Sequence, residues 1–360
     1  MATHALSHRR FILLCVLLCA GALLLVGFLL PDVERLVRAD LPDETHVTVL
    51  ARGDGDTLLA ATQVGTIWRL KHGVWRQERT DLAGHLVLAL GGDVDRMPIG
   101  TASGLLMEHA VGPIPGDPRV SDLLVWGDAL LAATGAGLWV AVGDTWSQPL
   151  ADRNLYRLIA QPGPDETILH AGTIGDGVYS APARTLTQSW QPNSLALPHG
   201  VKILSFAVTA FGPVLAGTDQ GLFWQSAPGT SWRVLDPQLH GRRILALFCE
   251  PIVMNDGQQR LWIGGDAGLV SVDLLMRDGR LLAAGVPRVY PPLWEPLRAG
   301  VSWIQPSPDG LVISAGALYR LQSVRPPGWF RFPLAAIILV VAVGGWWWLN
   351  PPSESGDSAR

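Results

Sequence analysis

The side chains that could do chemistry in this chain are few and widely separated. Among its 360 residues are nine His and three Cys, and Cys15 and Cys19 both lie in an apolar run. No two His of the central region have the spacing of zinc ligands, and Cys249 stands alone there. A zinc site and a disulfide framework are therefore excluded. We expect no metal and no cofactor.

The motifs of the common catalytic sites are also missing from the sequence. It contains no Gly-x-Ser-x-Gly turn, no phosphate-binding glycine loop and no calcium loop. Asp54 with Asp56, and Asp93 with Asp95, could suggest a cation, but Gly and Asp in such positions are more typical of solvated turns between strands. We therefore expect a protein that is not an enzyme.

Basic residues form the pattern that most suggests a binding surface. They stand at or just before most of the short apolar segments interpreted below as inner strands: His46, His85, Arg119, Arg153 or Arg157, His199 or Lys202, Arg242 or Arg243, and Arg298. A ring of positive charge would attract an acidic peptide or loop. We predict that five of them bind a partner: Arg119, Arg157, Lys202, Arg243 and Arg298. Alternatively they are ordinary solvated side chains, some paired with Asp152, Asp219 or Asp266.

An internal repeat must position these residues. Seven units combine a small residue, a Thr or its replacement, a glycine turn and an apolar or aromatic residue, as in 131–139 (LAATGAGLW). The Thr-equivalent positions are 62, 101, 134, 173, 218, 265 and 316. Their mean spacing of about 42 residues matches a four-stranded propeller blade. We predict an all-β fold, a seven-bladed β-propeller over residues 44–324. Six or eight blades are alternatives, because the last unit is truncated.

Further strand signals accompany each unit. An apolar segment precedes it and is interpreted as an inner strand, at 47–50, 86–90, 123–126, 155–159, 203–208, 244–248 and 301–304. After four units a Trp indicates an outer strand: Trp75, Trp146, Trp190 and Trp232. Three other Trp are core residues or interface hot spots: Trp126, Trp294 and Trp303.

The Ala-Gly-Thr-x-x-Gly-Leu-aromatic units, with turns that end in Thr/Ser-x-Trp or Gly-x-Trp, resemble the Asp-box (BNR) and regulator-type propeller repeats. Sialidases, sortilin-like receptors and the photosystem II assembly factor group share such repeats. Residues 226–232 (SAPGTSW) depart from the Asp-box pattern by one missing residue and by Pro228 near the Asp position. The resemblance implies that these turns are structural. A sialidase-like enzyme would need an Arg cluster, an acidic group and a Tyr nucleophile, and this chain has only four Tyr.

Two apolar runs flank the repeat region. Residues 11–30 carry no charge, and neither do residues 332–349, which end in Trp346, Trp347 and Trp348. About 20 apolar residues span a bilayer as a helix, and terminal Trp residues fit an interfacial belt. We predict two transmembrane helices at 11–30 and 332–349, with tails at 1–10 and 350–360. A cleaved signal peptide and a buried core helix are the respective alternatives.

The flanking charges do not settle which side of the membrane the large domain occupies. A simple count of Arg places it in the cytoplasm, but long loops translocate largely regardless of charge. Arg9 and Arg10, just before the first apolar run, resemble the charged region of an export signal. We therefore predict a two-pass protein of the bacterial inner membrane with its large domain in the periplasm.

The net charge of −4 argues against a generally basic, nucleic-acid-binding protein. The favoured function is a membrane-anchored, non-catalytic scaffold or assembly factor for a membrane protein complex. Its partners would be acidic segments of other membrane or periplasmic proteins, and the lipid bilayer through two helices. The alternative is a periplasmic sensor or receptor that binds a small ligand or polysaccharide at the channel mouth. A propeller glycoside hydrolase is less favoured.

Overall fold

The computed structural model describes residues 33–39, 41, 46–53, 55–91, 97–107, 112–188, 190–253, 257–290, 297 and 300–324. The predicted helices at 11–30 and 332–349, both tails, Trp294 and Arg298 lie outside the described residues. Within the described ranges, none of the helices is long and apolar enough to span a bilayer. The helices found there are two short 3-10 turns, η2 (Ala183–Thr185) and η3 (Pro237–Leu239).

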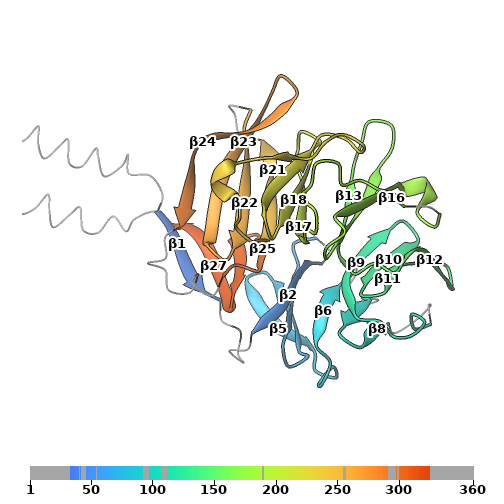
Figure 1. The fold of residues 1–360 in the computed structure, drawn as a ribbon. Coiled ribbons are helices and arrows are strands. Elements are labelled where there is room, and N and C mark those ends of the chain that lie inside the picture. The colour runs from blue at the N-terminus through green and yellow to red at the C-terminus, as the bar shows by residue number, and fades with distance from the viewer. Residues whose placement is uncertain are drawn as a thin grey trace, which may run out of the picture. The chain divides into compact units, whose positions relative to one another are not determined.

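Seven sheets form the blades of a propeller (Figure 1). Blade 1 comprises β2 (Val47–Arg52), β3 (Leu58–Thr62), β4 (Ile67–Lys71) and β5 (Val74–Arg79). Blade 2 comprises β6 (Val87–Leu90), β7 (Ile99–Thr101) and β8 (Gly104–Leu106). Blade 3 comprises β9 (Val120–Trp126), β10 (Ala129–Thr134), β11 (Gly137–Val142) and β12 (Thr145–Ala151). Blade 4 comprises β13 (Leu155–Gln161), β14 (Ile168–Thr173), β15 (Val178–Pro182) and β16 (Gln191–Pro192).

The last three blades complete the ring. Blade 5 comprises β17 (Ile203–Val208), β18 (Val214–Thr218), β19 (Gly221–Gln225) and β20 (Arg233–Val234). Blade 6 comprises β21 (Ile244–Val253), β22 (Gln259–Gly265), β23 (Gly268–Arg277) and β24 (Arg280–Tyr290). Blade 7 comprises β25 (Trp303–Ser307), β26 (Gly310–Ala315), β27 (Ala317–Val324) and, outermost, β1 (Val33–Arg38). The predicted seven-bladed all-β fold is confirmed.

The N-terminal strand closes the ring. The order β1-β27-β26-β25 places β1 at the outer edge of the last blade, so β1 completes the unit that looks truncated in sequence. This strand lies before the predicted domain boundary at residue 44. At the inner side of the same seam, β25 lies against β2, and the Trp303 indole Nε1 donates a hydrogen bond to the Thr48 carbonyl over 2.8 Å.

Apolar side chains between neighbouring blades form the core. Leu59 and Ile67 of blade 1 pack with Val87 and Ile99 of blade 2, and all four are fully buried. Burying one such side chain contributes about 1.5–3 kcal/mol. A single short sheet leaves both faces exposed to water, so the blades are stable only against one another.

The predicted Thr positions are structurally equivalent. Thr62, Thr101, Thr134, Thr173 and Thr218 all have 0% exposure and clamp the turn that follows the second strand of each blade. The Thr134 hydroxyl, for example, donates to the Gly137 carbonyl over 2.7 Å. In blade 6 Gly265 replaces the Thr, because a Cβ there would lie 2.1 Å from the Arg243 carbonyl oxygen. Close contact with the chain thus explains why the sixth unit departs from the pattern.

Candidate functional site

Six of the seven innermost strands share a β-bulge at their second residue. The bulged residues are Thr48, Leu88, Ser121, Tyr156, Leu204 and Leu245. A bulge leaves one residue unpaired and redirects its side chain. All six line one cavity, together with Ser302 and Trp303 of blade 7. Every blade therefore contributes to the mouth of an axial channel.

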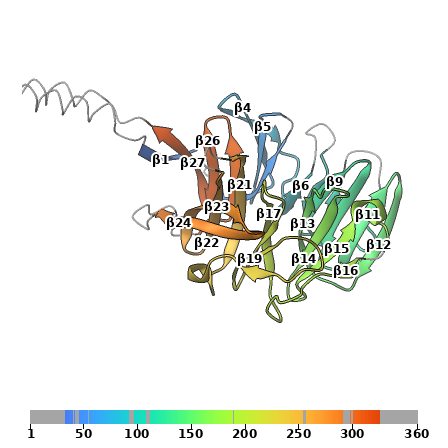
Figure 2. The same cartoon turned by 90° about the horizontal axis from the view of Figure 1, so that it is seen from above.

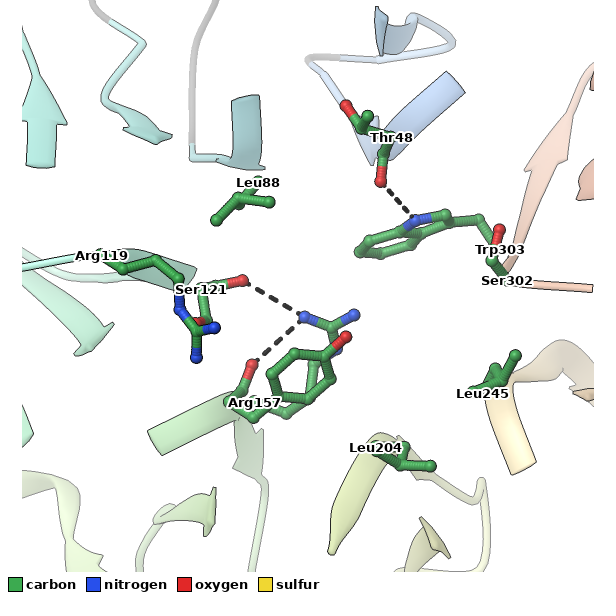
Figure 3. A pocket seen from close by; sticks show the side chains of 10 residues that line it. Thr48, Leu88, Arg119, Ser121, Arg157, Leu204, Leu245, Ser302 and Trp303 are labelled. Carbon is green, nitrogen blue, oxygen red and sulfur yellow. Dashed lines mark hydrogen bonds between the residues drawn. The ribbon is translucent and has the colours of Figure 1, made fainter. Parts of the chain in front are cut away.

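The mouth combines apolar walls with a few polar groups (Figure 3). Its cavity measures about 400 Å³. Leu88, Leu204 and Leu245 supply apolar surface, and the Trp303 indole adds a flat face. Below it, a second cavity of about 160 Å³ continues between Asp122, Phe206 and Gln305. Arg157, Leu245 and Trp303 line both cavities, so these side chains lie where the two cavities adjoin.

Two aromatic rings hold the Arg157 guanidinium. Its central carbon lies 4.3 Å from the Tyr156 ring centroid and 4.8 Å from that of Trp303, distances at which cations interact favourably with π-faces. Its Nη1 donates to the carbonyls of Ser121 and Tyr156 over 3.3 and 3.2 Å (Figure 3). Its Nε and Nη2 donate to no described residue, so one side of the guanidinium is available to a ligand.

Asp122 and Ser121 lie beside this arginine. The Asp122 carboxylate accepts hydrogen bonds from the main-chain N–H groups of Leu123 and Leu158, over 3.0 and 2.8 Å. Desolvation raises the pKa of Asp122, and the charge of Arg157 together with these N–H groups opposes the rise. The Ser121 hydroxyl is buried and has no hydrogen-bond partner in the described part of the chain. Buried polar groups normally have one. Its hydroxyl is therefore a buried polar group that the fold leaves unsatisfied at the edge of the mouth.

The predicted cationic ring is only partly assembled. Arg119 is exposed, lines the mouth and donates from Nη2 to the Asn154 side-chain oxygen over 3.1 Å. Arg119 and Arg157 thus come together. Arg243 instead pairs with Asp266, 3.6 Å away, outside the mouth. Lys202 is exposed and does not line the mouth either; its main-chain N–H donates to Asp219.

Aspartates in the turn between the second and third strands of a blade explain why some of the predicted basic residues are paired and Arg119 is not. Asp176, Asp219 and Asp266 occupy these turns in blades 4, 5 and 6, next to the basic residue that precedes the inner strand of the same blade. In blade 3 the corresponding turn holds Ala136, so Arg119 meets no carboxylate within ion-pair distance among the described residues. The two arginines of the mouth are therefore the ones best placed to attract an anion.

Sequence reasoning missed several groups of the mouth. Tyr156 and Ser121 are bulged residues, and a signal for them exists, since each is the second residue of an inner strand. Asp122 is a single charge in an apolar strand, an unusual pattern that marks it for inspection. Of the Trp residues outside the repeat, Trp126 packs on the core between blades 3 and 4, whereas Trp303 lines the mouth.

In the described ranges, no three His, Cys, Asp or Glu side chains lie closely enough together to hold a metal ion. Cys249 is largely buried, which raises the pKa of its thiol to about 12. A thiol with so high a pKa is a poor nucleophile and a poor metal ligand near neutral pH.

No protein-family model matches the chain, and no curated protein matches it in sequence. Its fold is similar to solved structures. The extracellular domain of a protein described as the one-component system BT4673 from B. thetaiotaomicron has a TM-score of 0.59 at 15% identity. The match covers 80% of this chain and 40% of that one, so this chain spans about two fifths of the BT4673 chain.

Two further similar structures are those of YCF48. The protein from Cyanidioschyzon merolae has a TM-score of 0.53 at 13% identity, with 80% of this chain and 98% of that chain covered. A structure of YCF48 bound to D1 peptide has a TM-score of 0.54 at 16% identity, with 81% and 99% covered. Similarity at this level of identity shows a shared fold, and a fold hosts many functions.

Proposed function

We propose that this chain is a non-catalytic, membrane-anchored scaffold or assembly factor whose channel mouth binds an acidic segment of a membrane or periplasmic protein. The observation that carries the proposal is the pair Arg119 and Arg157, which face one cavity without a neutralising ion pair among the described residues. An Arg fork matches a carboxylate in shape and charge. The apolar walls suit the aliphatic or aromatic neighbours of that carboxylate.

Two findings favour a protein partner. The structure of YCF48 bound to D1 peptide shows that one protein of similar fold binds a peptide. The resemblance of the repeats in sequence to those of the assembly factor group is a second argument for a scaffold. In the two cavities Asp122 has the one carboxylate among the lining residues, whereas glycoside hydrolysis typically uses a pair.

Charge reversal in the mouth tests the proposal. We expect the full-length Arg119→Glu/Arg157→Glu variant to lose partners that co-purify with the wild type from detergent-solubilised membranes. Binding should also weaken as salt rises, because the Debye length falls from about 8 Å at physiological ionic strength to about 3 Å at 1 M. Unchanged partners in a folded variant would contradict the proposal. Arg157→Gln, which adds no negative charge beside Asp122, guards against a folding defect.

Arg243→Glu is the matched control. Arg243 is equally cationic and exposed on the same face, but it is paired with Asp266 and lies outside the mouth. We expect this variant to keep its partners. Equal losses in both variants would indicate a diffuse attraction by the whole face rather than a site at the mouth.

A sensor or receptor for a small ligand is the second candidate. The observation that favours it is the volume of the mouth, about 400 Å³, within the range of small-molecule sites. The similar BT4673 structure is described as an extracellular domain of a one-component system. A ligand that binds the native state would raise the melting temperature of the purified chain, so a thermal-shift screen of small anions and oligosaccharides tests this function.

Membrane anchoring is part of the proposal. The apolar runs at 11–30 and 332–349 would hold the protein in the bacterial inner membrane, with the propeller in the periplasm. A phosphatase reporter inserted at the exposed Gly279 turn should be active if that turn is exported. An inactive phosphatase with an active cytoplasmic reporter at the same position would reverse the orientation.

A further inference from the structure

The outermost strand of blade 6 differs from a typical exposed edge. The strand β24 is 11 residues long, and Val286 is 89% exposed, Val289 54% and Leu282 41%. Arg280 and Arg288 of the same strand are also exposed, a β-bulge lies between them at 285–287, and the nearest acidic residue in the sequence is the exposed Asp278 of the preceding turn. Long apolar edges promote aggregation unless something covers them. Arginines close to a bilayer are attracted to anionic lipid headgroups.

The strand β24 is the outer edge of blade 6, and β1, which follows the first apolar run in sequence, is the outer edge of the neighbouring blade 7. The inward-facing Tyr290 of β24 belongs to the same core cluster as Leu36 of β1. In both views of the ribbon, β24 and β1 lie on the same side of the ring (Figures 1 and 2). Val37 of β1 is exposed as well, so the outer edge of blade 7 also carries an apolar side chain.

Only a short segment of chain separates the first apolar run from β1. If residues 11–30 span the membrane, only 31 and 32 separate Leu30 from the start of β1 at Val33. Three residue steps reach at most about 11 Å. The headgroup layer of one leaflet is about 5–8 Å thick. The start of β1, at the outer edge of blade 7, is therefore within reach of the headgroups whenever the span is inserted.

The opposite part of the ring has a different charge. In blade 3 the outermost strand β12 contains no charged residue, and Asp144 and Asp152 flank it. Blade 5 offers a closer comparison, because its outermost strand β20 consists of Arg233 and Val234 alone, the same residue pair as Arg288 and Val289. The strand β24 thus carries more exposed apolar and basic side chains than β12 or β20.

We propose that β24 is a lipid-contacting edge, on which Arg280 and Arg288 bind the phosphates of anionic phospholipids while Val286 and Val289 enter the headgroup layer. This inference rests on the proposed membrane anchoring, and it is independent of what the channel mouth binds. Each arginine near an anionic surface increases the contact equilibrium by about fivefold. Lipid would also cover the open hydrogen-bonding edge of the strand.

An environment-sensitive fluorophore at residue 286 tests the proposal. The probe is attached to Val286→Cys in the full-length chain with Cys15 and Cys19 replaced by Ser; the largely buried Cys249, whose thiol pKa is raised to about 12, remains unlabelled. In nanodiscs that contain about one third phosphatidylglycerol, we expect emission at shorter wavelength than in pure phosphatidylcholine. Salt at about 1 M should reverse the shift, because screening then extends only about 3 Å.

Two variants make the result specific. Arg280→Glu/Arg288→Glu should abolish the shift at residue 286, and a probe at Val234→Cys on β20 should show none. Equal emission from Val286→Cys in both lipids, or an equal shift at Val234→Cys, overturns the proposal. A shift that depends on protein concentration in detergent without lipid would indicate a second copy of the chain and would also overturn it.

A separate measurement distinguishes an error in the proposed membrane anchoring from an error in the proposed lipid contact. If the chain is removed from nanodiscs by alkaline carbonate, the anchoring and the lipid contact are both wrong. If the chain stays inserted but the probe at residue 286 does not respond, the lipid contact alone is wrong. Partner binding is measured independently with the Arg119 and Arg157 variants described above.

Discussion

The channel mouth and the polar cluster between blades 4 and 5 use similar residue types in opposite ways. In the cluster, His170 of β14 is fully buried, with Nδ1 2.7 Å from the Ser180 hydroxyl and Nε2 2.8 Å from the Gln161 side-chain oxygen. In the mouth, the guanidinium of Arg157 has donors that no described residue accepts. Polar groups that are satisfied internally stabilise the fold, whereas unsatisfied ones in a cavity are available to a ligand.

The hydrogen bonds of this cluster determine which atom of each pair is the donor. Gln161 donates from its side-chain nitrogen to the Gly212 carbonyl, so its oxygen must accept, and His170 Nε2 must carry the proton. His170 Nδ1 then accepts from Ser180, whose oxygen accepts in turn from Asn193. Asn193 also exchanges two hydrogen bonds with Gln225 of blade 5, over 2.9 and 2.8 Å. The cluster thus connects the two blades.

The largest effect is expected from Asn193→Ala. This change leaves the buried Gln225 oxygen and the Gly229 N–H without a partner. We expect it to lower the free energy of unfolding by about 4 kcal/mol, because several buried groups lose their hydrogen bonds together. Urea denaturation of the full-length protein in detergent measures the change. Asn154→Ala, at the exposed partner of Arg119, is the control and should change stability by less than about 0.5 kcal/mol.

The second effect is a dependence of stability on pH. Burial lowers the pKa of His170 from 6.5 to about 4, so the unfolded chain takes up a proton at higher pH than the folded one. The stability should be complete above about pH 7 and fall toward pH 4 by up to about 1.4 kcal/mol per pH unit, or about 3 kcal/mol in total. His170→Gln should have a flatter profile over this range. An equally steep profile in that variant would assign the effect to other groups.

A smaller effect is expected from Thr134→Val. The Thr134 hydroxyl donates to the Gly137 carbonyl and accepts from the Ala136 N–H over 3.2 Å, and a valine of similar shape can do neither. We expect a loss of about 1–2 kcal/mol, measured by the same urea denaturation. Thr145→Val, at an exposed position of β12, should have little effect. Equal losses would contradict the role of Thr134 as a turn clamp.

The smallest effect on stability is expected from Arg119→Gln. Arg119 is exposed and makes one hydrogen bond, to Asn154. Its replacement should change the unfolding free energy by less than about 0.5 kcal/mol, although partner binding should decrease. A variant of the mouth should thus lose partner binding but little stability, whereas a variant of the polar cluster should lose stability. A strong destabilisation by Arg119→Gln would show that the mouth, too, is a structural feature.

The blades were predictable from the sequence because their signals are local. An apolar segment, a Thr and a glycine turn lie within about 20 residues of one another in each unit, and the short turn fixes how the second and third strands pair. The closing strand β1 was not predicted. Its partner strand β27 begins at Ala317, and no local signal indicates a pairing across so much of the chain.

The site was predictable in part for a similar reason. The pattern of basic residues at or just before inner strands includes both arginines of the mouth: Arg119 directly precedes β9, and Arg157 is the third residue of β13. Whether such a residue is free depends on the turn of its own blade, where Asp266 pairs with Arg243 and Ala136 leaves Arg119 unpaired. Recognising that Asp266 and Ala136 occupy equivalent turns requires a strand-by-strand alignment of the blades, and the structure provides that alignment.

Closure of the ring by β1 also means that blade 7 cannot be completed until the end of the propeller has been synthesised. The first strand of blade 7 to leave the ribosome is β1, which ends at Arg38, and the strand beside it ends at Val324. At about 5–20 residues per second, translation of the intervening chain takes about 15–60 s. Throughout this interval six blades can assemble around an open gap while β1 waits without a partner. The nascent propeller is thus most exposed to misassembly just before its last three strands appear.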